Sequence, residues 1–255
     1  MLWLDTRQIQ PEGQRTVAVS FPRPANAIHI GMLWTIPNIL TALRLVAAPG
    51  VAVMFLYFNR PWADWFALIL FSVAALTDWV DGYLARALKQ ETRLGAMLDP
   101  IADKAMVVIA LLVITGFSGM NPWILLPSTL ILFREVSVSG LREFLGDQSG
   151  TLKVTNLAKW KTTAQMVAIA ILFARGAFEH YIGMLTQGMD EALVAAVLAG
   201  REEDVFGLRW LVIGWDACWY GGVLLLWLAA ALTLVTGWDY FRKAWPYLKE
   251  ERSDD

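Results

Sequence analysis

Residues 65–117 read WFALILFSVAALTDWVDGYLARALKQETRLGAMLDPIADKAMVVIALLVITGF, two apolar runs joined by a polar middle. Four aspartates stand in or beside these runs as two pairs, Asp78 with Asp81 and Asp99 with Asp103. A carboxylate at membrane depth is energetically costly, so residues of this kind are usually functional. The four aspartates are therefore the first candidate site.

The rest of the chain has the same membrane character. Of its 255 residues, 57% are hydrophobic and 17% are charged, and the apolar residues gather into long runs. We predict an all-α integral membrane protein with six transmembrane helices, near residues 39–58, 62–87, 99–117, 122–145, 159–175 and 210–238. The net charge of -2 gives no support for a nucleic-acid partner, and a single cysteine, Cys218, excludes an intrachain disulfide.

The chain is expected to divide into three parts. Residues 1–35 form a flexible N-terminal arm, residues 36–241 form the six-helix membrane domain, and residues 242–255 form a polar tail. An outer loop of about 177–209 contains an apolar stretch that is too short to cross a bilayer, and we expect a surface helix there, at 192–199.

The distribution of Lys and Arg predicts the orientation. In a six-span chain, the arm, the second-to-third and fourth-to-fifth connections and the tail lie on one side, and each carries at least three such residues. The opposite connections hold only Arg60, Arg175, Arg201 and Arg209. By the positive-inside rule, both termini and the aspartates face the cytoplasm.

Charged side chains in five of the spans begin at a similar depth. Read from the outer end, each first charge follows about thirteen mostly apolar positions, or roughly 20 Å of helix. These charges are Arg44, Asp78, Asp103 with Lys104, Arg134 and Lys161. We predict that they line a polar cavity open to the cytoplasm. The alternative is that each charge marks a helix end and reaches back to the interface.

The spacing of the aspartates indicates a metal site. Asp78 and Asp81 are three residues apart and Asp99 and Asp103 are four apart, so each pair shares one face of a helix. Four neighbouring carboxylates in a low-dielectric setting need cations. Oxygen ligands without His or Cys suit Mg²⁺, Mn²⁺ or Ca²⁺.

Small residues and one arginine stand between the two pairs. Gly82, Ala85 and Gly95 leave room for a ligand to approach, and Arg86 offers a fork-shaped donor suited to phosphate. Beside four aspartates, these residues favour a phosphate ligand. The alternative is that the small residues are contacts between packed membrane helices.

These residues together resemble a known signature. The pattern is Asp78-x-x-Asp81-Gly82-x-x-Ala85-Arg86, eight residues, then Gly95-x-x-x-Asp99-x-x-x-Asp103, and it is similar at all eight specified positions to that of the CDP-alcohol phosphotransferases. The resemblance covers about residues 36–173 and includes 37–44, 134–137, 142–143 and 159–165. It departs at Ala158, where a glycine is expected.

The resemblance implies a reaction. Enzymes of this family cleave the pyrophosphate of a CDP-linked lipid, pass the phosphatidyl group to an alcohol and release CMP. The chain looks most like bacterial members, which implies CDP-diacylglycerol and sn-glycerol 3-phosphate as substrates, the inner membrane as location and a homodimer. It also implies two ions of Mg²⁺ or Mn²⁺ that assist in-line attack.

The same resemblance implies roles for single residues. Asp78, Asp81, Asp99 and Asp103 become metal ligands, and Asp103 also becomes the general base, with Lys104 as the alternative base. The expected contacts to the CDP-lipid are Asn38, Thr41, Asp78, Gly82, Ala85, Arg86 and Gly95. Asn38 has an alternative role as a helix cap, and Thr41 as a partner of its own backbone.

The acceptor phosphate needs cations near the aspartates. Arg134 and Lys161 are the first candidates because they belong to the charged layer, followed by Arg142 and Lys159, which could instead be topology signals. Other acceptors remain open: serine, inositol phosphate or phosphatidylglycerol. A divalent-cation transporter is a further alternative, but the outer halves of the spans contain no matching acidic row.

The resemblance begins a few residues after Met32. We therefore expect that translation starts at Met32 in the natural protein, which the intact mass of protein made from its own promoter would test.

Overall fold

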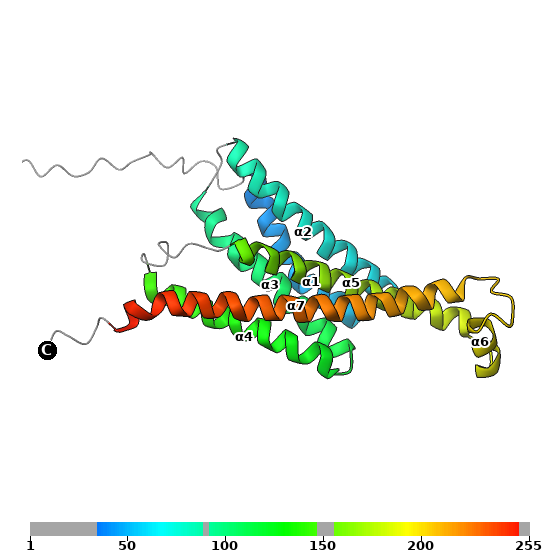
Figure 1. Cartoon of the computed structure of the whole chain (residues 1–255). Helices are drawn as coiled ribbons and strands as arrows, with labels where there is room; N and C mark the ends of the chain where they lie inside the picture. The colour runs from blue at the N-terminus through cyan, green and yellow to red at the C-terminus, as the bar shows by residue number, and fades with distance from the viewer. Residues whose placement is uncertain (1–34, 89–91, 147–155, 250–255) are drawn as a thin grey trace, which may run out of the picture. The chain divides into compact units, whose positions relative to one another are not determined.

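The computed structural model describes residues 35–88, 92–146 and 156–249, and within them the side chains of 37, 78–88, 93, 156–159 and 249 lie outside the description. These ranges contain helices and no strands (Figure 1). The helices are α1 (Ile36–Tyr57), α2 (Trp62–Leu88), α3 (Arg93–Phe117), α4 (Pro122–Leu145), α5 (Asn156–Thr186), α6 (Glu191–Leu198) and α7 (Leu208–Lys249). The prediction of an all-α protein is confirmed for the described part of the chain.

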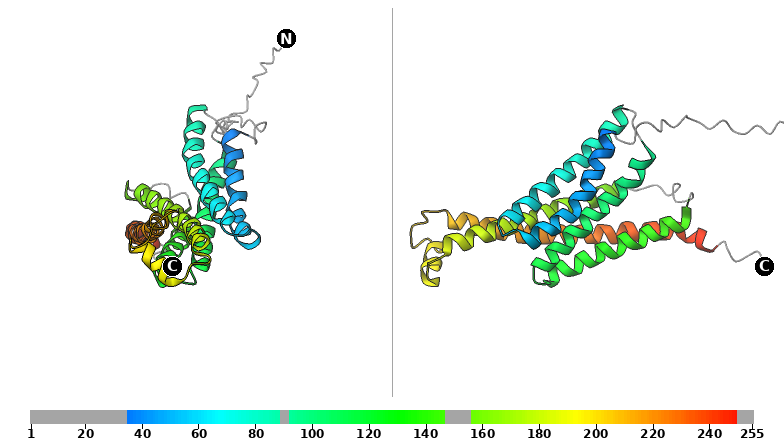
Figure 2. Two further views of the ribbon diagram at one scale, coloured as in Figure 1. Left: turned by 90° about the vertical axis from the view of Figure 1, so that its right-hand side faces the viewer. Right: turned by 180° about the vertical axis from the view of Figure 1, so that it is seen from behind.

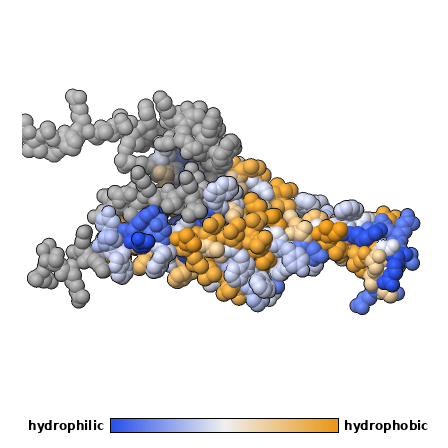
Figure 3. Space-filling view, viewed as in Figure 1, coloured by the Kyte–Doolittle hydropathy of each residue, from blue (hydrophilic) through white to orange (hydrophobic). Residues whose placement is uncertain are grey.

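Four of these helices are long and apolar enough to cross a membrane. The stretches are Asn38–Tyr57, Pro122–Leu145, Trp160–Thr186 and Leu208–Leu248, and a shorter apolar helix covers Trp62–Thr77. In Figure 3, hydrophobic side chains cover the middle of α7, and hydrophilic ones gather at its two ends. The chain is therefore a multi-pass membrane protein, and six spans remain a prediction.

Local sequence explains where the helices begin. Thr35 caps α1 by accepting a hydrogen bond from the backbone N–H of Asn38, and Thr92 caps α3 by accepting one from Gly95. Asn121 caps α4, with Pro122 in the first turn. Thr35 rather than Asn38 is thus the cap of α1, and Asn38 lies inside the helix.

The connection between α5 and α7 is shorter than expected. Helix α5 continues to Thr186, and α7 begins at Leu208, so the expected loop 177–209 includes the last turns of α5. Helix α6 occupies the stretch where a surface helix was predicted. Helix α7 also continues to Lys249, through the start of the expected tail.

Two helix pairs build the domain: α5 packs along α7, and α1 packs along α3 (Figure 2). Helix α4 packs on α7, and α2 packs on α1 and α5. The core between them consists of large apolar side chains, which include Phe71, Leu111, Ile131, Ile169 and Leu226. This packing places the N-terminal turns of α1 and α3 together, and these turns carry the candidate site.

Candidate active site

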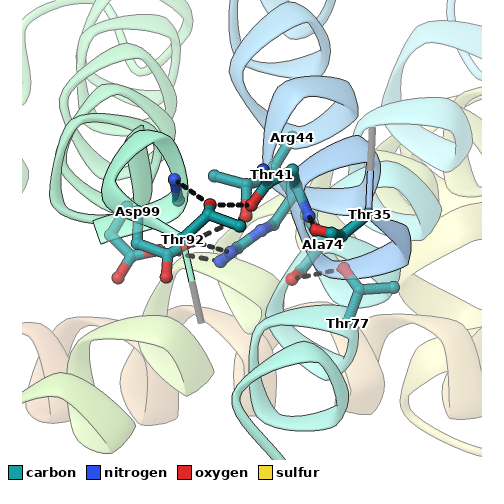
Figure 4. A network of polar contacts seen from close by, with 10 residues as sticks. Thr35, Thr41, Arg44, Ala74, Thr77, Thr92 and Asp99 are labelled. Atoms are coloured by element: carbon teal, nitrogen blue, oxygen red, sulfur yellow. Dashed lines mark hydrogen bonds and ion pairs between the residues drawn. The ribbon is translucent and has the colours of Figure 1, made fainter. Parts of the chain in front are cut away.

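Asp99 and Asp103 of α3 meet two polar side chains of α1. Figure 4 shows Asp99 with Thr41 and Arg44. Thr41 Oγ1 donates to Asp99 Oδ1 at 2.6 Å. The Arg44 guanidinium donates to both aspartates, at 2.8 Å to Asp103 Oδ1 and at 3.3 Å to Asp99 Oδ1. The two aspartates lie one helical turn apart and share one cation.

The burial of this group is asymmetric. Arg44 is only 4% exposed, whereas the side chains of Asp99 and Asp103 are 48% and 43% exposed. A buried guanidinium is stable only with hydrogen-bonded counter-charges, which the two aspartates supply. The carboxylates are therefore anchored on the α1 side and open on another, where a ligand can approach.

Asn38 and Gly95 form the neighbouring contact between α1 and α3. Thr92 Oγ1 donates to the buried Asn38 Oδ1 at 2.9 Å, and the same hydroxyl accepts from Gly95 N at 3.0 Å. A Cβ at Gly95 would lie 2.7 Å from Asn38 Oδ1, so any larger residue there would displace the Asn38 amide from this position. The structure thus brings together Asn38, Thr41, Gly95, Asp99 and Asp103. It also supports helix packing as one reason for Gly95.

The first half of the signature lies in α2. Asp78, Asp81, Gly82, Ala85 and Arg86 fall within its bounds, but their side chains lie outside the described residues. Among the described side chains, no group of three His, Cys, Asp or Glu residues is close enough to hold a metal ion. Asp99 and Asp103 supply carboxylate oxygens beside the Thr41 hydroxyl, a donor set that fits a hard divalent cation. The four-aspartate metal site remains a prediction.

A second group of charges lies between α4 and α5. Glu135 Oε1 accepts from Arg134 Nη1 at 2.8 Å and from Lys161 Nζ at 2.5 Å. Arg142 is exposed, and its guanidinium lies 5.2 Å from the centre of the Tyr240 ring. The side chain of Lys159 lies outside the described residues. Of the four cations expected for the acceptor, the structure thus joins Arg134 and Lys161 through Glu135.

Lys104 and Ser139 connect the two groups of charges. Lys104 Nζ donates to Ser139 Oγ at 2.6 Å, and Ser139 Oγ donates to the backbone carbonyl of Glu135 at 2.6 Å. Because Lys104 follows Asp103 in α3, this contact ties the aspartate helix to α4. The ammonium of Lys104 is thus held by a hydroxyl of α4.

Two residues of the site carried no predicted role. Arg44 belonged to the layer of charges, and Glu135 belonged to the resembling segment 134–137, but neither was assigned a function. Both act across a helix interface, at Asp99 and Asp103 for Arg44 and at Lys161 for Glu135. For Arg44 the available signal was depth, because an unassigned charge in a layer of functional charges needs a partner of opposite sign; for Glu135 it was the position next to Arg134.

A separate ion-pair group joins the start of α2 to the C-terminal half of α5. Arg60 donates to both oxygens of the buried Asp64, at 2.8 and 2.7 Å, and to Glu179 at 3.3 Å. The hydrogen bond to Asp64 raises the pKa of Arg60 above its ordinary value, and the charges of Asp64 and Glu179 add to this. Arg60 therefore stays charged and fastens the start of α2 to α5.

Comparison with known proteins identifies relatives along most of the chain. The family described as CDP-alcohol phosphatidyltransferase matches residues 34–235. A protein from Cereibacter sphaeroides is 67% identical over 222 residues, which cover 87% of this chain and 100% of that protein. A protein from Pseudomonas fluorescens is 35% identical over 85% of this chain and 93% of its own length. A third, from Shigella flexneri serotype 5b, is 39% identical over 60% of this chain and 85% of its own length. All three are named CDP-diacylglycerol--glycerol-3-phosphate 3-phosphatidyltransferase.

Proposed function

Because the chain belongs to the CDP-alcohol phosphatidyltransferase family, we propose that it transfers the phosphatidyl group of CDP-diacylglycerol to sn-glycerol 3-phosphate. The products are phosphatidylglycerophosphate and CMP. One observation carries this assignment: a relative that is 67% identical over 87% of this chain, and over the whole length of the relative, bears the name of this enzyme. The acceptor is thus inferred from that relative, and the site must provide for its phosphate.

The chain offers two cations for the acceptor. Arg134 and Lys161 come from neighbouring helices and meet at one carboxylate oxygen, so a phosphate group can contact both. Arginine and lysine are the usual donors to a phosphate dianion. We assign Arg134 and Lys161 to the acceptor phosphate, followed by Arg142 and Lys159 as second candidates.

The donor lies at the aspartates in this proposal. Members of the family generally use divalent metal ions. We propose that Asp78, Asp81, Asp99 and Asp103 hold two ions of Mg²⁺ or Mn²⁺. Bound there, such ions neutralise charge that develops on the leaving CMP. Asn38, Thr41, Gly82, Ala85, Arg86 and Gly95 complete the proposed surface for the CDP-lipid.

Asp103 is the proposed general base. Its carboxylate is half-exposed, and its Oδ1 is held by Arg44, which fixes the orientation of the group. The acceptor hydroxyl gives its proton to Asp103 while its oxygen forms a bond to the phosphatidyl phosphorus. The bond between that phosphorus and the CMP oxygen breaks, and CMP leaves with the electron pair.

The membrane arrangement extends the same proposal. Six spans would place both termini and the aspartates on the cytoplasmic side of the bacterial inner membrane, and the distribution of Lys and Arg supports this orientation. The aspartate end would then form a polar cavity open to the cytoplasm. A homodimer rests on the family resemblance alone.

A direct assay tests the function. The purified full-length chain in detergent receives CDP-diacylglycerol, Mg²⁺ or Mn²⁺ and one acceptor at a time, and CMP release is followed. We expect release with glycerol 3-phosphate and none with serine, inositol phosphate or phosphatidylglycerol. Release with one of those three, and none with glycerol 3-phosphate, would overturn the assignment.

The role of Asp103 is tested in the same assay. Asp103→Asn removes the proton acceptor but keeps the size of the side chain, so we expect turnover to be lost while CDP-diacylglycerol still binds. Binding is measured by titration calorimetry with the intact lipid in detergent. Turnover equal to that of the wild type would remove Asp103 from the role of base.

A further inference from the structure

Glu135 lies at the centre of the cation pair that the acceptor phosphate is proposed to use. Its Oε1 is the shared partner of Arg134 Nη1 and Lys161 Nζ. The side chains of Arg134, Glu135 and Lys161 are only 14%, 17% and 8% exposed, so water screens them poorly. The carboxylate is therefore the group that holds two mutually repelling cations at one point.

The position of this carboxylate matters for binding an anion. Arginine and lysine side chains have many rotamers, and fixing them when a ligand arrives reduces affinity. Glu135 fixes both side-chain ends in the absence of a ligand and brings a donor of α4 next to a donor of α5. A phosphate that replaces one of these bonds finds both donors already in place.

Glu135 is also connected to the helix of the proposed base. Its backbone carbonyl accepts from Ser139, and Ser139 accepts from Lys104, the residue after Asp103. These contacts fix the position of this segment of α4 relative to α3. The distance between the cation pair and the aspartates is thereby set by the same part of α4.

We propose that Glu135 is a positioning residue for the acceptor. It holds Arg134 and Lys161 at the spacing that one phosphate group requires, and it gives up one of its two bonds when that phosphate binds. This inference rests on the proposed function, because it takes the acceptor phosphate as the ligand of the two cations. Glu135 acts through Arg134 and Lys161 and does not touch the reacting atoms.

The test separates the two substrates. Glu135→Gln keeps the size of the side chain and removes its charge. In this variant we expect the KM for glycerol 3-phosphate to rise about tenfold or more, which corresponds to the loss of one charge-assisted hydrogen bond. The KM for CDP-diacylglycerol should stay within about twofold and kcat within about threefold, because the interaction lost does not involve the donor. Glu135→Asp, which keeps the charge on a shorter stem, should give a KM for glycerol 3-phosphate between those of the wild type and the Gln variant.

A matched control and two further outcomes decide the matter. Glu191→Gln makes the same chemical change at an exposed position of α6, and it should leave all three constants unchanged. An unchanged KM for glycerol 3-phosphate in Glu135→Gln would overturn the inference. A parallel rise of both KM values without recovery in Glu135→Asp would also overturn it, because that pattern indicates a general packing role.

Inorganic phosphate separates this inference from the assignment of the acceptor. With whichever acceptor the wild type uses, inorganic phosphate should inhibit competitively, and Glu135→Gln should raise its inhibition constant about tenfold. If the wild type fails with glycerol 3-phosphate, the proposed function is overturned, and this inhibition constant still decides the role of Glu135. Equal constants in the wild type and the variant would refute that role.

Discussion

Arg44 reaches from α1 to Asp99 and Asp103 of α3 and is almost fully buried. A buried cation with two carboxylates neutralises part of the negative charge that a metal ion would otherwise neutralise alone. The residue thus stabilises the folded protein when no metal is bound. Its removal should make the fold depend on divalent ions.

Arg44→Gln tests this dependence. We expect the melting temperature in EDTA to fall by about 4–8 °C, taking about 2 kcal/mol for the lost ionic hydrogen bonds. Added Mg²⁺ or Mn²⁺ should raise the melting temperature more in the variant than in the wild type, because the uncompensated carboxylates attract a cation more strongly. Differential scanning fluorimetry in detergent measures both values, and Arg242→Gln at an exposed position of α7 is the control. An equal response to metal in variant and wild type would contradict the idea.

Single charged residues were easier to predict from the sequence than the interaction partners of those residues. The sequence led to Asp99, Asp103, Arg134 and Lys161 because charged residues in apolar stretches stand out. The partners of these residues lie across helix interfaces, and a single sequence carries no information on which faces meet. Glu135 shows this limit: it stands beside Arg134 in the sequence, but its contact with Lys161 of α5 depends on the tertiary arrangement of the helices.

At the scale of elements, α7 contacts the cation pair through a glycine. A Cβ at Gly237 would lie 2.8 Å from Arg134 Cγ, so α7 passes directly against the stem of that side chain. Helices α4 and α7 also border an apolar groove of about 720 Å³, and Arg134 is one of its lining residues. Any side chain at this position would push Arg134 away from its place beside Glu135.

Gly237→Ala should therefore weaken acceptor binding. We expect the KM for glycerol 3-phosphate to rise about threefold to tenfold, which corresponds to about 1 kcal/mol of lost interaction. Gly221→Ala on the same helix is the control, because a Cβ there meets no atom within 4 Å. Alanine at an unobstructed helix position is neutral or stabilising. Steady-state kinetics on both variants is the measurement, and similar KM values would remove Gly237 from this role.

The start of α7 depends on a carboxylate outside the membrane stretches. Asp204 accepts from the backbone N–H groups of Arg209 and Leu208, at 3.0 and 2.7 Å. The bond from Arg209 is the main reason that the pKa of Asp204 lies below its ordinary value of 3.8, with the bond from Leu208 adding to it. A lowered pKa stabilises the folded state at pH values above that ordinary value, and the stabilisation is lost as the pH falls through the folded pKa.

Asp204→Ala tests this pH dependence. The melting temperature of the wild type should exceed that of the variant at pH 6–7, and the difference should shrink progressively below about pH 4. Thermal unfolding followed by circular dichroism across this range is the measurement. A difference that stays constant down to the lowest pH would contradict a contribution from the ionised carboxylate.

The ends of helices were less predictable than their middles. The predicted fifth span ends at Arg175, yet α5 continues to Thr186. In the structure its guanidinium lies 4.2 and 4.6 Å from the ring centres of Trp215 and Trp219 on α7. Aromatic faces stabilise a cation without requiring water, so the helix continues past the charge.

At the scale of the whole domain, the proposed chemistry and an important source of stability lie at opposite helix ends. The aspartates and the cation pair gather where α1 and α3 begin, whereas Arg60, Asp64 and Glu179 gather where α2 begins and α5 ends. Gly176 of α5 lies so close to the Asp64 carboxylate that no side chain would fit there. The burial of Asp64 and the contacts of this second group indicate that it stabilises the fold.

Asp64→Asn should separate stability from activity. Asp64 is 1% exposed and its partner Arg60 is 34% exposed, so we expect a loss of about 2 kcal/mol, below the value for a fully buried pair. This corresponds to a melting temperature about 4–8 °C lower. The kcat and both KM values of the remaining folded enzyme should not change. Asp239→Asn, at a surface pair, should shift the melting temperature much less. Altered kinetics in Asp64→Asn would show that this end also shapes the site.

The length of α7 has a consequence for where the two substrates can meet. Its 42 residues extend roughly 63 Å, about twice the thickness of the hydrocarbon layer, so even a tilted α7 must project into the headgroup region or the water. The end that carries Gly237 and Tyr240 lies beside Arg134 and Arg142. The turns of α7 that project from the hydrocarbon layer can thus form a protein surface at the level of the lipid headgroups. A water-soluble alcohol can bind against this surface of α7 without entering the hydrocarbon layer, and the acyl chains of the lipid donor remain in that layer.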